Sequence, residues 1–149
     1  MKNKIFFANP KSQYISQKMD INSAIREVLN SNTYIGGKII ERFESNFSKF
    51  VESKYSISCK SGTDAIFLAL KACGIKDNDE VIIPSHTAVA TATAVKMLRA
   101  KPVFVDIDEY FTIDIKQIKK LYNEKTKAII AVHLYGQSCD IVNIVKFAK

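Results

Sequence analysis

The sequence predicts an α/β fold, with three α/β/α layers around a mostly parallel sheet. Short, uniformly apolar segments alternate with segments in which apolar residues recur at helical spacing. Alternating strands and helices favour a parallel sheet with right-handed crossovers. The continuously apolar strands agree with this, because helices cover both faces of a parallel sheet. At 149 residues and 47% hydrophobic composition, the chain is long enough for one domain with a buried core.

The first third of the chain predicts an N-terminal helical arm at about residues 1–50. Apolar residues at helical spacing predict helices over 19–29 and 39–50. The polar run Asn30-Ser31-Asn32-Thr33 and the pair Gly36-Gly37 separate these two helices.

The remainder of the chain carries the alternation that predicts the sheet. Strands are expected over 55–59, 81–83, 103–105 and 128–132, and helices over 65–73, 88–98, 115–122 and 141–147. Gly74 is placed to close the first of these helices. The last helix runs to Lys149 with no capping glycine and no following strand, so we expect a truncated domain.

Composition and targeting signals narrow the class of protein. Asn9-Pro10 interrupts the N-terminal residues before a signal peptide could form. No run approaches the roughly 20 apolar residues of a membrane span. The net charge of +7 comes from scattered lysines, which suggests genomic bias rather than nucleic-acid binding and is compatible with an anionic small substrate. We therefore expect a cytoplasmic protein with neither a nucleic-acid nor a membrane partner.

The cysteines predict no metal or redox site. Cys59, Cys73 and Cys139 are odd in number and widely spaced, without the close pairs that a zinc site or a redox motif needs. We interpret them as reduced structural residues.

The segment Ser61-Gly62-Thr63-Asp64 is the first candidate site, because it joins a predicted strand to a predicted helix. A helix start presents unpaired backbone N–H groups and the positive end of the helix dipole, which together suit a phosphate. Gly62 allows close backbone approach, and the hydroxyls of Ser61 and Thr63 can add hydrogen bonds. An ordinary helix cap formed by Ser61 or Thr63 is the alternative.

Two further polar segments follow predicted strands. Pro84–Thr91 opens a helix and carries His86, which could cover a planar cofactor, bind substrate or be structural. The segment His133-Leu134-Tyr135-Gly136 follows the last strand. Ligands bind at the carboxyl edge of parallel sheets, so three polar loops at this edge favour a binding site there.

In the order and the residues of these segments, the sequence resembles the DegT/DnrJ-like nucleotide-sugar aminotransferases. These are pyridoxal-phosphate enzymes of the aspartate-aminotransferase fold (fold type I). The resemblance covers nearly the whole chain. It rests on Tyr34–Gly37 with Phe43-Glu44, on Ser61–Ala65, on Pro84–Thr91, on Pro102–Asp108 and on His133–Gly136. It implies that residues 1–149 are the N-terminal part of the large domain of such an enzyme.

The resemblance also implies roles for individual residues. Gly62 and Thr63 would hold the phosphate of pyridoxal 5'-phosphate. The family commonly has an aromatic residue over the cofactor ring where this sequence has Ala88, so His86 is the candidate for the covering role. Tyr34, His133 and Tyr135 would contact the substrate.

The family's catalytic residues have no counterpart in this sequence. The aspartate that pairs with the pyridine nitrogen and the lysine that forms the Schiff base would both lie beyond Lys149, so no catalytic residue is assigned and we expect the isolated chain to be inactive.

The function implied for the parent protein is amino transfer from an amino-acid donor, usually glutamate, to a keto-sugar nucleotide. Members of the family are dimers, and the segment around Tyr34 would belong partly to the dimer interface. Two alternatives stay open, namely a sugar dehydratase of the same family and a non-catalytic truncated remnant.

Overall fold

The computed structural model describes residues 6–149. Residues 1–5, which belong to the predicted helical arm and to the segment in which no signal peptide is expected, lie outside the described part. The chain divides into two compact units, Met1–Ser58 and Cys59–Lys149. Whether both belong to one domain stays a prediction, and each unit is described by itself.

The first unit consists of three helices, α1 (Pro10–Ser16), α2 (Lys18–Asn30) and α3 (Lys38–Phe50). The two helices predicted from periodicity are confirmed as α2 and α3. The sequence analysis missed α1, although its start carries two ordinary signals. The side chain of Asn9 accepts a hydrogen bond from the Ser12 amide, and Pro10 occupies the first helical position.

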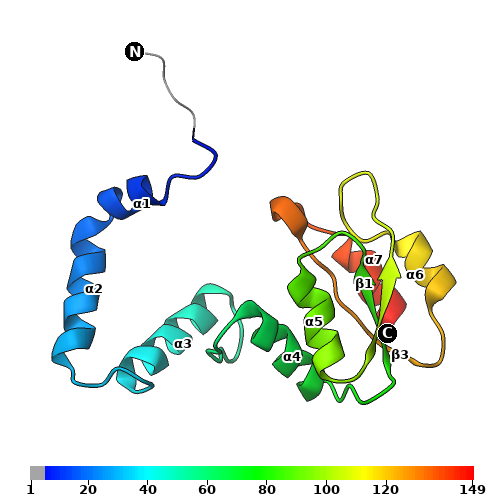
Figure 1. The fold of residues 1–149 in the computed structure, drawn as a ribbon, viewed down its shortest axis with the longest axis horizontal. Coiled ribbons are helices and arrows are strands. Elements are labelled where there is room, and N and C mark those ends of the chain that lie inside the picture. Colours follow the sequence, from blue (N-terminus) through cyan, green and yellow to red (C-terminus); the bar gives the residue numbers. More distant parts are fainter. Residues whose placement is uncertain (1–5) are drawn as a thin grey trace, which may run out of the picture. The chain divides into compact units, whose positions relative to one another are not determined.

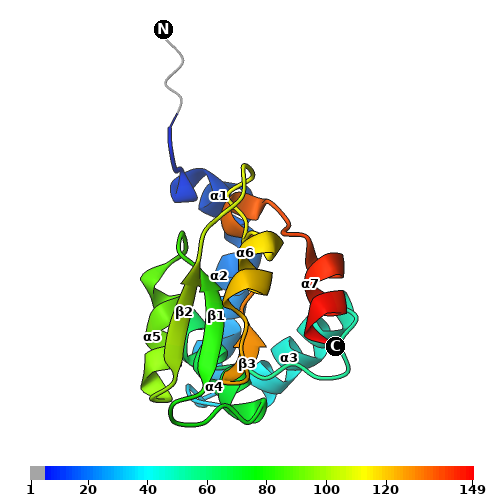
Figure 2. The same ribbon diagram turned by 90° about the vertical axis from the view of Figure 1, so that its right-hand side faces the viewer.

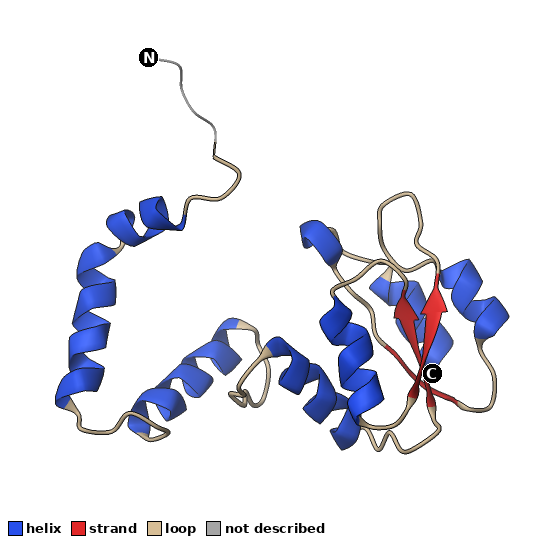
Figure 3. Cartoon of the chain, in the orientation of Figure 1, coloured by secondary structure: helices blue, strands red, loops and turns tan. Residues whose placement is uncertain are grey.

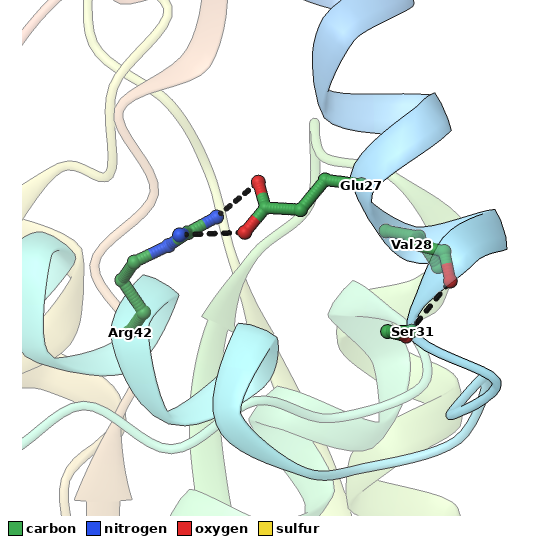
Figure 4. A network of polar contacts seen from close by, with 4 residues as sticks. All are labelled: Glu27, Val28, Ser31 and Arg42. Atoms are coloured by element: carbon green, nitrogen blue, oxygen red, sulfur yellow. Dashed lines mark hydrogen bonds and ion pairs between the residues drawn. The ribbon is translucent and has the colours of Figure 1, made fainter.

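A bidentate ion pair links α2 to α3, as Figure 4 shows. Both terminal nitrogens of Arg42 donate to the Glu27 carboxylate at 2.9 Å. The hydrogen bond from Arg42 and its positive charge lower the pKa of Glu27. In the same figure, the Ser31 hydroxyl donates to the Val28 carbonyl at the end of α2. None of the described residues of this unit is buried, so the unit has no core of its own.

The second unit is built on a three-stranded sheet of order β2-β1-β3, shown in red in Figure 3. Its strands are β1 (Glu80–Pro84), β2 (Lys101–Val105) and β3 (Thr126–Ile129). The central strand β1 pairs in parallel with both neighbours. The predicted parallel sheet is therefore confirmed.

Helices cover both faces of this sheet (Figures 1 and 2). Helices α4 (Gly62–Ala72) and α5 (Val89–Met97) lie on one face, and α6 (Ile115–Leu121) and α7 (Ile141–Ala148) lie on the other. Alternate residues of β1 pack into two separate hydrophobic cores, one on each face of the sheet. Val81 and Ile83 pack with Leu70, Ile75, Val95 and Ala100, whereas Ile82 packs with Val105, Ile113, Ile118, Cys139 and Ile144. The three-layer α/β/α arrangement is thus confirmed for residues 59–149.

The strand predicted over 55–59 is wrong. This stretch has no regular secondary structure, no described strand pairs with it, and Ile57 is 82% exposed. A β-prone sequence becomes a strand only when a neighbouring backbone satisfies its N–H and C=O groups. Here the Ser58 amide donates instead to the Glu44 carboxylate, 2.6 Å away.

Strand β3 begins and ends earlier than the predicted 128–132. The Ile130 N–H still donates to the Ile82 carbonyl at 2.8 Å. In a parallel ladder, the Ile130 carbonyl would next accept from the residue two positions after Ile82. That residue is Pro84, which has no N–H, so pairing stops there.

Within residues 6–149, no helix combines the length and the apolar character that crossing a bilayer requires.

Gly74 closes α4 in the way that the sequence predicts. It has φ +81°, its N–H donates to the Lys71 carbonyl, and the Ile75 N–H donates to the Leu70 carbonyl. This is the paired bonding of a Schellman motif, in which the glycine adopts the left-handed conformation.

Replacing Gly74 by alanine is expected to lower the free energy of unfolding by about 1 to 2 kcal/mol, because a Cβ is disfavoured at positive φ. Urea denaturation followed by circular dichroism measures the change. Gly62→Ala is the matched control, since Gly62 lies at a helix start and a Cβ there would meet no atom within 4 Å. An equal loss in both variants would contradict this account of Gly74.

Candidate functional site

The hydroxyl of Ser61 is the N-cap of α4. Its oxygen accepts a hydrogen bond from the Asp64 amide at 3.2 Å and donates to the Asp64 carboxylate at 2.8 Å. The capping alternative considered for this segment therefore holds for Ser61. Thr63 does not cap the helix, because its hydroxyl has no hydrogen-bond partner among the described residues.

The amides of Gly62 and Thr63 are the free donors of this helix start. They occupy the first two helical positions, and no acceptor among residues 6–149 bonds to them. The helix dipole adds partial positive charge at the same point. A Cβ built on Gly62 would meet open space, so the protein itself does not crowd these donors. The arrangement suits an anion such as a phosphate.

These donors border a cavity of about 550 Å³ within the second unit. Three segments line it, namely the start of α4, the residues between β1 and the first turns of α5, and the residues after β3. The lining residues are Gly62, Thr63, Ile66, Thr87, Ala88, Ala90, Thr91, Ile130, Ala131, Val132, His133 and Leu134. No lysine, arginine or carboxylate is among them. Because β1 and β3 are parallel, the cavity lies where ligands bind in sheets of this kind.

The cavity wall is apolar apart from a few placed polar groups. The hydroxyls of Thr87 and Thr91 lie 3.0 Å apart and bond to each other, and Thr91 is buried. An apolar cavity with an anion-binding helix start at its border fits a planar, phosphorylated organic molecule.

Three rings form an aromatic cluster, which consists of His86, Phe111 and Tyr135. They come from the loops after β1, β2 and β3. The centroid of His86 lies 5.9 Å from that of Tyr135 and 6.1 Å from that of Phe111, and the last two are 6.2 Å apart. The His86 Nε2 atom and the Tyr135 hydroxyl are hydrogen-bonded at 3.0 Å.

Two members of the aromatic cluster have strained backbone. Phe111 has φ +61° and Tyr135 has φ +56°, a region that bulky side chains rarely occupy. Such conformations cost of order 1 to 3 kcal/mol and persist only where surrounding bonds hold them. For Phe111, these bonds come from Asp108.

The carboxylate of Asp108 organises the loop that carries Phe111. It accepts hydrogen bonds from the amides of Tyr110 and Thr112 at 2.9 Å and from the Thr112 hydroxyl at 2.8 Å. Burial works against the charged carboxylate, but these hydrogen bonds from Thr112 and Tyr110 outweigh it and lower the pKa of Asp108. The sequence analysis named Asp108 only as the end of the family segment Pro102–Asp108.

His133 closes the loop between β3 and α7. Its Nδ1 atom accepts a hydrogen bond from the amide of Cys139, 3.1 Å away. Cys139 is buried, and this burial, together with the charges of Asp140 and Asp108, raises the pKa of its thiol. The prediction of a reduced structural cysteine agrees with this environment at Cys139.

The structure distributes the predicted site residues over three places. Gly62, Thr63, Ala88 and His133 line the cavity. His86 and Tyr135 belong to the aromatic cluster rather than to the cavity wall. Tyr34 lies in the first unit, where its hydroxyl donates to the Leu29 carbonyl at 3.2 Å. The binding roles of all seven residues stay predictions.

Sequence reasoning missed Phe111 and Thr91. An aspartate followed four residues later by threonine is a turn signal that could have indicated an ordered loop around Phe111. No local signal marks Thr91, since its place in the cavity wall depends on how α5 packs. Among residues 6–149, no three histidine, cysteine or acidic side chains come together as metal ligands would.

The model of the DegT/DnrJ/EryC1/StrS aminotransferase family matches residues 16–149. The chain belongs to this family. The predicted resemblance is thereby confirmed, and the five segments that carried it all lie within the matched residues.

Relatives in the DegT/DnrJ/EryC1/StrS family carry the names of sugar-modifying enzymes and regulators. The chain is 43% identical over 138 residues to a "pleiotropic regulatory protein" of Geobacillus stearothermophilus, covering 92% of this chain and 37% of that protein. It is 42% identical to the UDP-2-acetamido-2-deoxy-3-oxo-D-glucuronate aminotransferase of Pseudomonas aeruginosa, covering 91% of this chain and 38% of that enzyme.

Solved structures of the family share the fold. The DesV protein of S. venezuelae superposes with a TM-score of 0.94 at 35% identity, over 99% of this chain and 40% of that one. The E. coli GDP-4-keto-6-deoxy-D-mannose-3-dehydratase, solved with bound hydrated PLP, gives 0.78 at 31% identity, over 84% and 34%. The predicted fold type I is confirmed by these neighbours, although the chain spans only about a third to two fifths of their length.

The Asp108 network predicts a pH dependence of stability. Because the pKa of Asp108 is lower in the folded state, its carboxylate stabilises the fold fully above about pH 4 and loses this effect as the pH falls through the folded-state pKa. In Asp108→Asn the amide oxygen can keep the bonds from the Tyr110 and Thr112 amides, but the charge is lost and the Thr112 hydroxyl no longer donates to a carboxylate, at a cost of about 1 kcal/mol near neutral pH. The difference in the free energy of unfolding between wild type and variant should become smaller as the pH falls.

Thermal unfolding at a series of pH values measures this gap. Glu109→Gln is the matched control, because its exposed side chain accepts no hydrogen bond from the described residues. A gap that stays constant into the acidic range would show that Asp108 does not stabilise the loop through its charge.

Proposed function

We propose that this chain is the cofactor-phosphate-binding part of a pyridoxal-phosphate-dependent aminotransferase that acts on a keto-sugar nucleotide. The observation that carries the proposal is the pair of unpartnered amides, Gly62 and Thr63, at the border of an apolar cavity. The bound PLP in a solved relative supports the choice of cofactor. The aminotransferase name of a 42% identical relative supports the choice of reaction.

The residues present fit the phosphate and the ring of pyridoxal phosphate. The phosphate would accept hydrogen bonds from the amides of Gly62 and Thr63 and from the Thr63 hydroxyl, next to the positive end of the α4 dipole. Ile66, Ala88 and Ile130 supply apolar surface for the ring. When bound, the cofactor acts as an electron sink during amino transfer.

In this chain the cavity offers binding groups, and His133 is the one described lining residue with an acid–base side chain. Its wall holds no lysine and no carboxylate, so the residues at hand can bind, orient and exclude water. We infer that the covalent lysine and the carboxylate partner of the pyridine nitrogen belong to a longer protein, since this chain spans 37% of one relative and 38% of another.

The amino donor and the oligomer are further parts of the proposal. Glutamate is the donor that we propose, together with a homodimer in which the segment around Tyr34 contributes to the interface. Exposed aromatic side chains on α3, among them Phe43 and Phe50, support a partner surface on the first unit.

A dehydratase is the second candidate function. It is favoured by the 31% identity to a sugar dehydratase, whose fold this chain shares. The two functions differ in their products, because an aminotransferase adds nitrogen to the sugar and converts glutamate to its keto acid, whereas a dehydratase removes water from the sugar. Mass spectrometry of a keto-sugar nucleotide incubated with the full-length protein and glutamate separates them.

Replacing Gly62 by proline removes one proposed phosphate donor without disturbing the helix. Proline is tolerated at the first helical position, and Ser61 before it is extended, as a residue preceding proline prefers. Loss of a hydrogen bond to a charged group should weaken pyridoxal-phosphate binding by about 1.5 to 3 kcal/mol, or roughly 10- to 150-fold. An absorbance titration measures the affinity.

The matched variant Gly62→Ala keeps the N–H and should bind within about twofold of wild type. Equal affinity of the proline variant and wild type, at unchanged thermal stability, would remove Gly62 from the phosphate site.

The cavity wall also predicts that cofactor binding to this chain is reversible. Since no lysine lines the cavity, the chain mixed with pyridoxal phosphate, dialysed and only then treated with borohydride should show no stoichiometric gain in mass. Intact-protein mass spectrometry gives the answer. A stoichiometric mass gain equal to the reduced cofactor would mean that a lysine of this chain reaches the site.

A further inference from the structure

Each of the two histidines of the chain uses one ring nitrogen in a hydrogen bond with a residue of the loop 133–139. His133 uses Nδ1, which accepts from the Cys139 amide at 3.1 Å. His86 uses Nε2, which is hydrogen-bonded to the Tyr135 hydroxyl at 3.0 Å. The partners differ in kind, because a hydroxyl can donate or accept whereas a backbone N–H can only donate. Only the bond of His133 therefore determines which ring nitrogen carries the proton.

The Cys139 amide holds His133 in one tautomer. To accept from an N–H group, Nδ1 must present a lone pair, so the proton of the neutral imidazole is on Nε2. Protonation of Nδ1 would leave the amide of the buried Cys139 without its acceptor, which is costly. The partner is well anchored, because the Cys139 carbonyl accepts from Ile141 and Asp140 caps α7.

The remaining nitrogen of His133 is free for a ligand. His133 lines the cavity, and among residues 6–149 its Nε2 has no hydrogen-bond partner. Two further polar side chains of the cavity wall, Thr87 and Thr91, already bond to each other. An Nε2–H group whose ring is held by the Cys139 amide is thus a preorganised donor at the cavity wall.

We propose that His133 is a neutral hydrogen-bond donor of the cavity, whose Nε2–H binds an oxygen acceptor of the molecule held there. It therefore does not serve as a proton acceptor. The inference rests on the proposed function, and the oxygen acceptor can belong to the cofactor or to the nucleotide sugar.

Two substitutions separate loop closure from ligand binding. In His133→Asn, the side-chain oxygen lies close to the place of Nδ1 and can accept from Cys139, but nothing reaches the place of Nε2. In His133→Gln, the amide nitrogen can reach the place of Nε2, while closure is lost. We expect the asparagine variant to keep wild-type thermal stability and to bind the ligand about tenfold more weakly. The glutamine variant should melt at a lower temperature.

The tautomer is measured without ligand. With two histidines in the chain, long-range ¹H–¹⁵N spectra resolve both rings, and His86→Gln assigns them. We expect the spectrum of His133 to show a protonated Nε2 and an unprotonated Nδ1 at neutral pH. A protonated Nδ1, alone or together with Nε2, would overturn the inference.

Titration with pyridoxal phosphate in one sample and UDP-N-acetylglucosamine in another then identifies the source of the acceptor. The Nε2–H resonance should move downfield with one of them. An unmoved resonance, in spectra where the Gly62 and Thr63 amides do shift, overturns the donor role and leaves the proposed function intact. If those amides do not shift either, the proposed function fails and the donor role fails with it. Wild-type affinity in His133→Asn would reduce His133 to a loop-closing residue.

Discussion

Parallel pairing of β1 with both neighbours is the constraint on which the candidate site depends. Because β1 and β3 run in the same direction, the segments that follow them emerge at one edge of the sheet. The start of α4 borders the same cavity, which places two unpartnered amides beside these segments. An antiparallel partner in place of β3 would send His133 and its neighbours to the opposite edge. Strand direction, rather than any single side chain, therefore assembles the site.

Pro84 has two effects at this edge. As the last residue of β1 it has no N–H, so the ladder with β3 stops at Ile130 and the following residues are released from the sheet. Ile130 and the released residues up to Leu134 form one wall of the cavity. The ring of Pro84 is also fully buried, at the end of β1. The width of the site is thus partly a consequence of one missing hydrogen-bond donor.

Local strain and polar closure occur together in the loops of this edge. Phe111 and Tyr135 have positive φ values. The Phe111 amide donates to the Asp108 carbonyl, and the Gln137 amide donates to the Leu134 carbonyl across Tyr135. Asp108 anchors one loop through three accepted bonds, and His133 closes the other through one. Each anchor is a side chain bonded to backbone amides, which helps to fix the shape of its loop. A rigid rim of this kind can orient a ligand with little loss of conformational entropy.

The sequence by itself determined the alternation of strands and helices, the closure of α4 by Gly74 and the membership of the family. These features depend on residues close together in the chain, so periodicity, capping residues and sequence motifs indicate them directly. Only the tertiary structure decided that 55–59 stays unpaired, that β3 stops at Ile129 and that Phe111 meets His86 and Tyr135. Such outcomes depend on which backbone groups find partners from distant segments, and that information exists only once the sheet has formed.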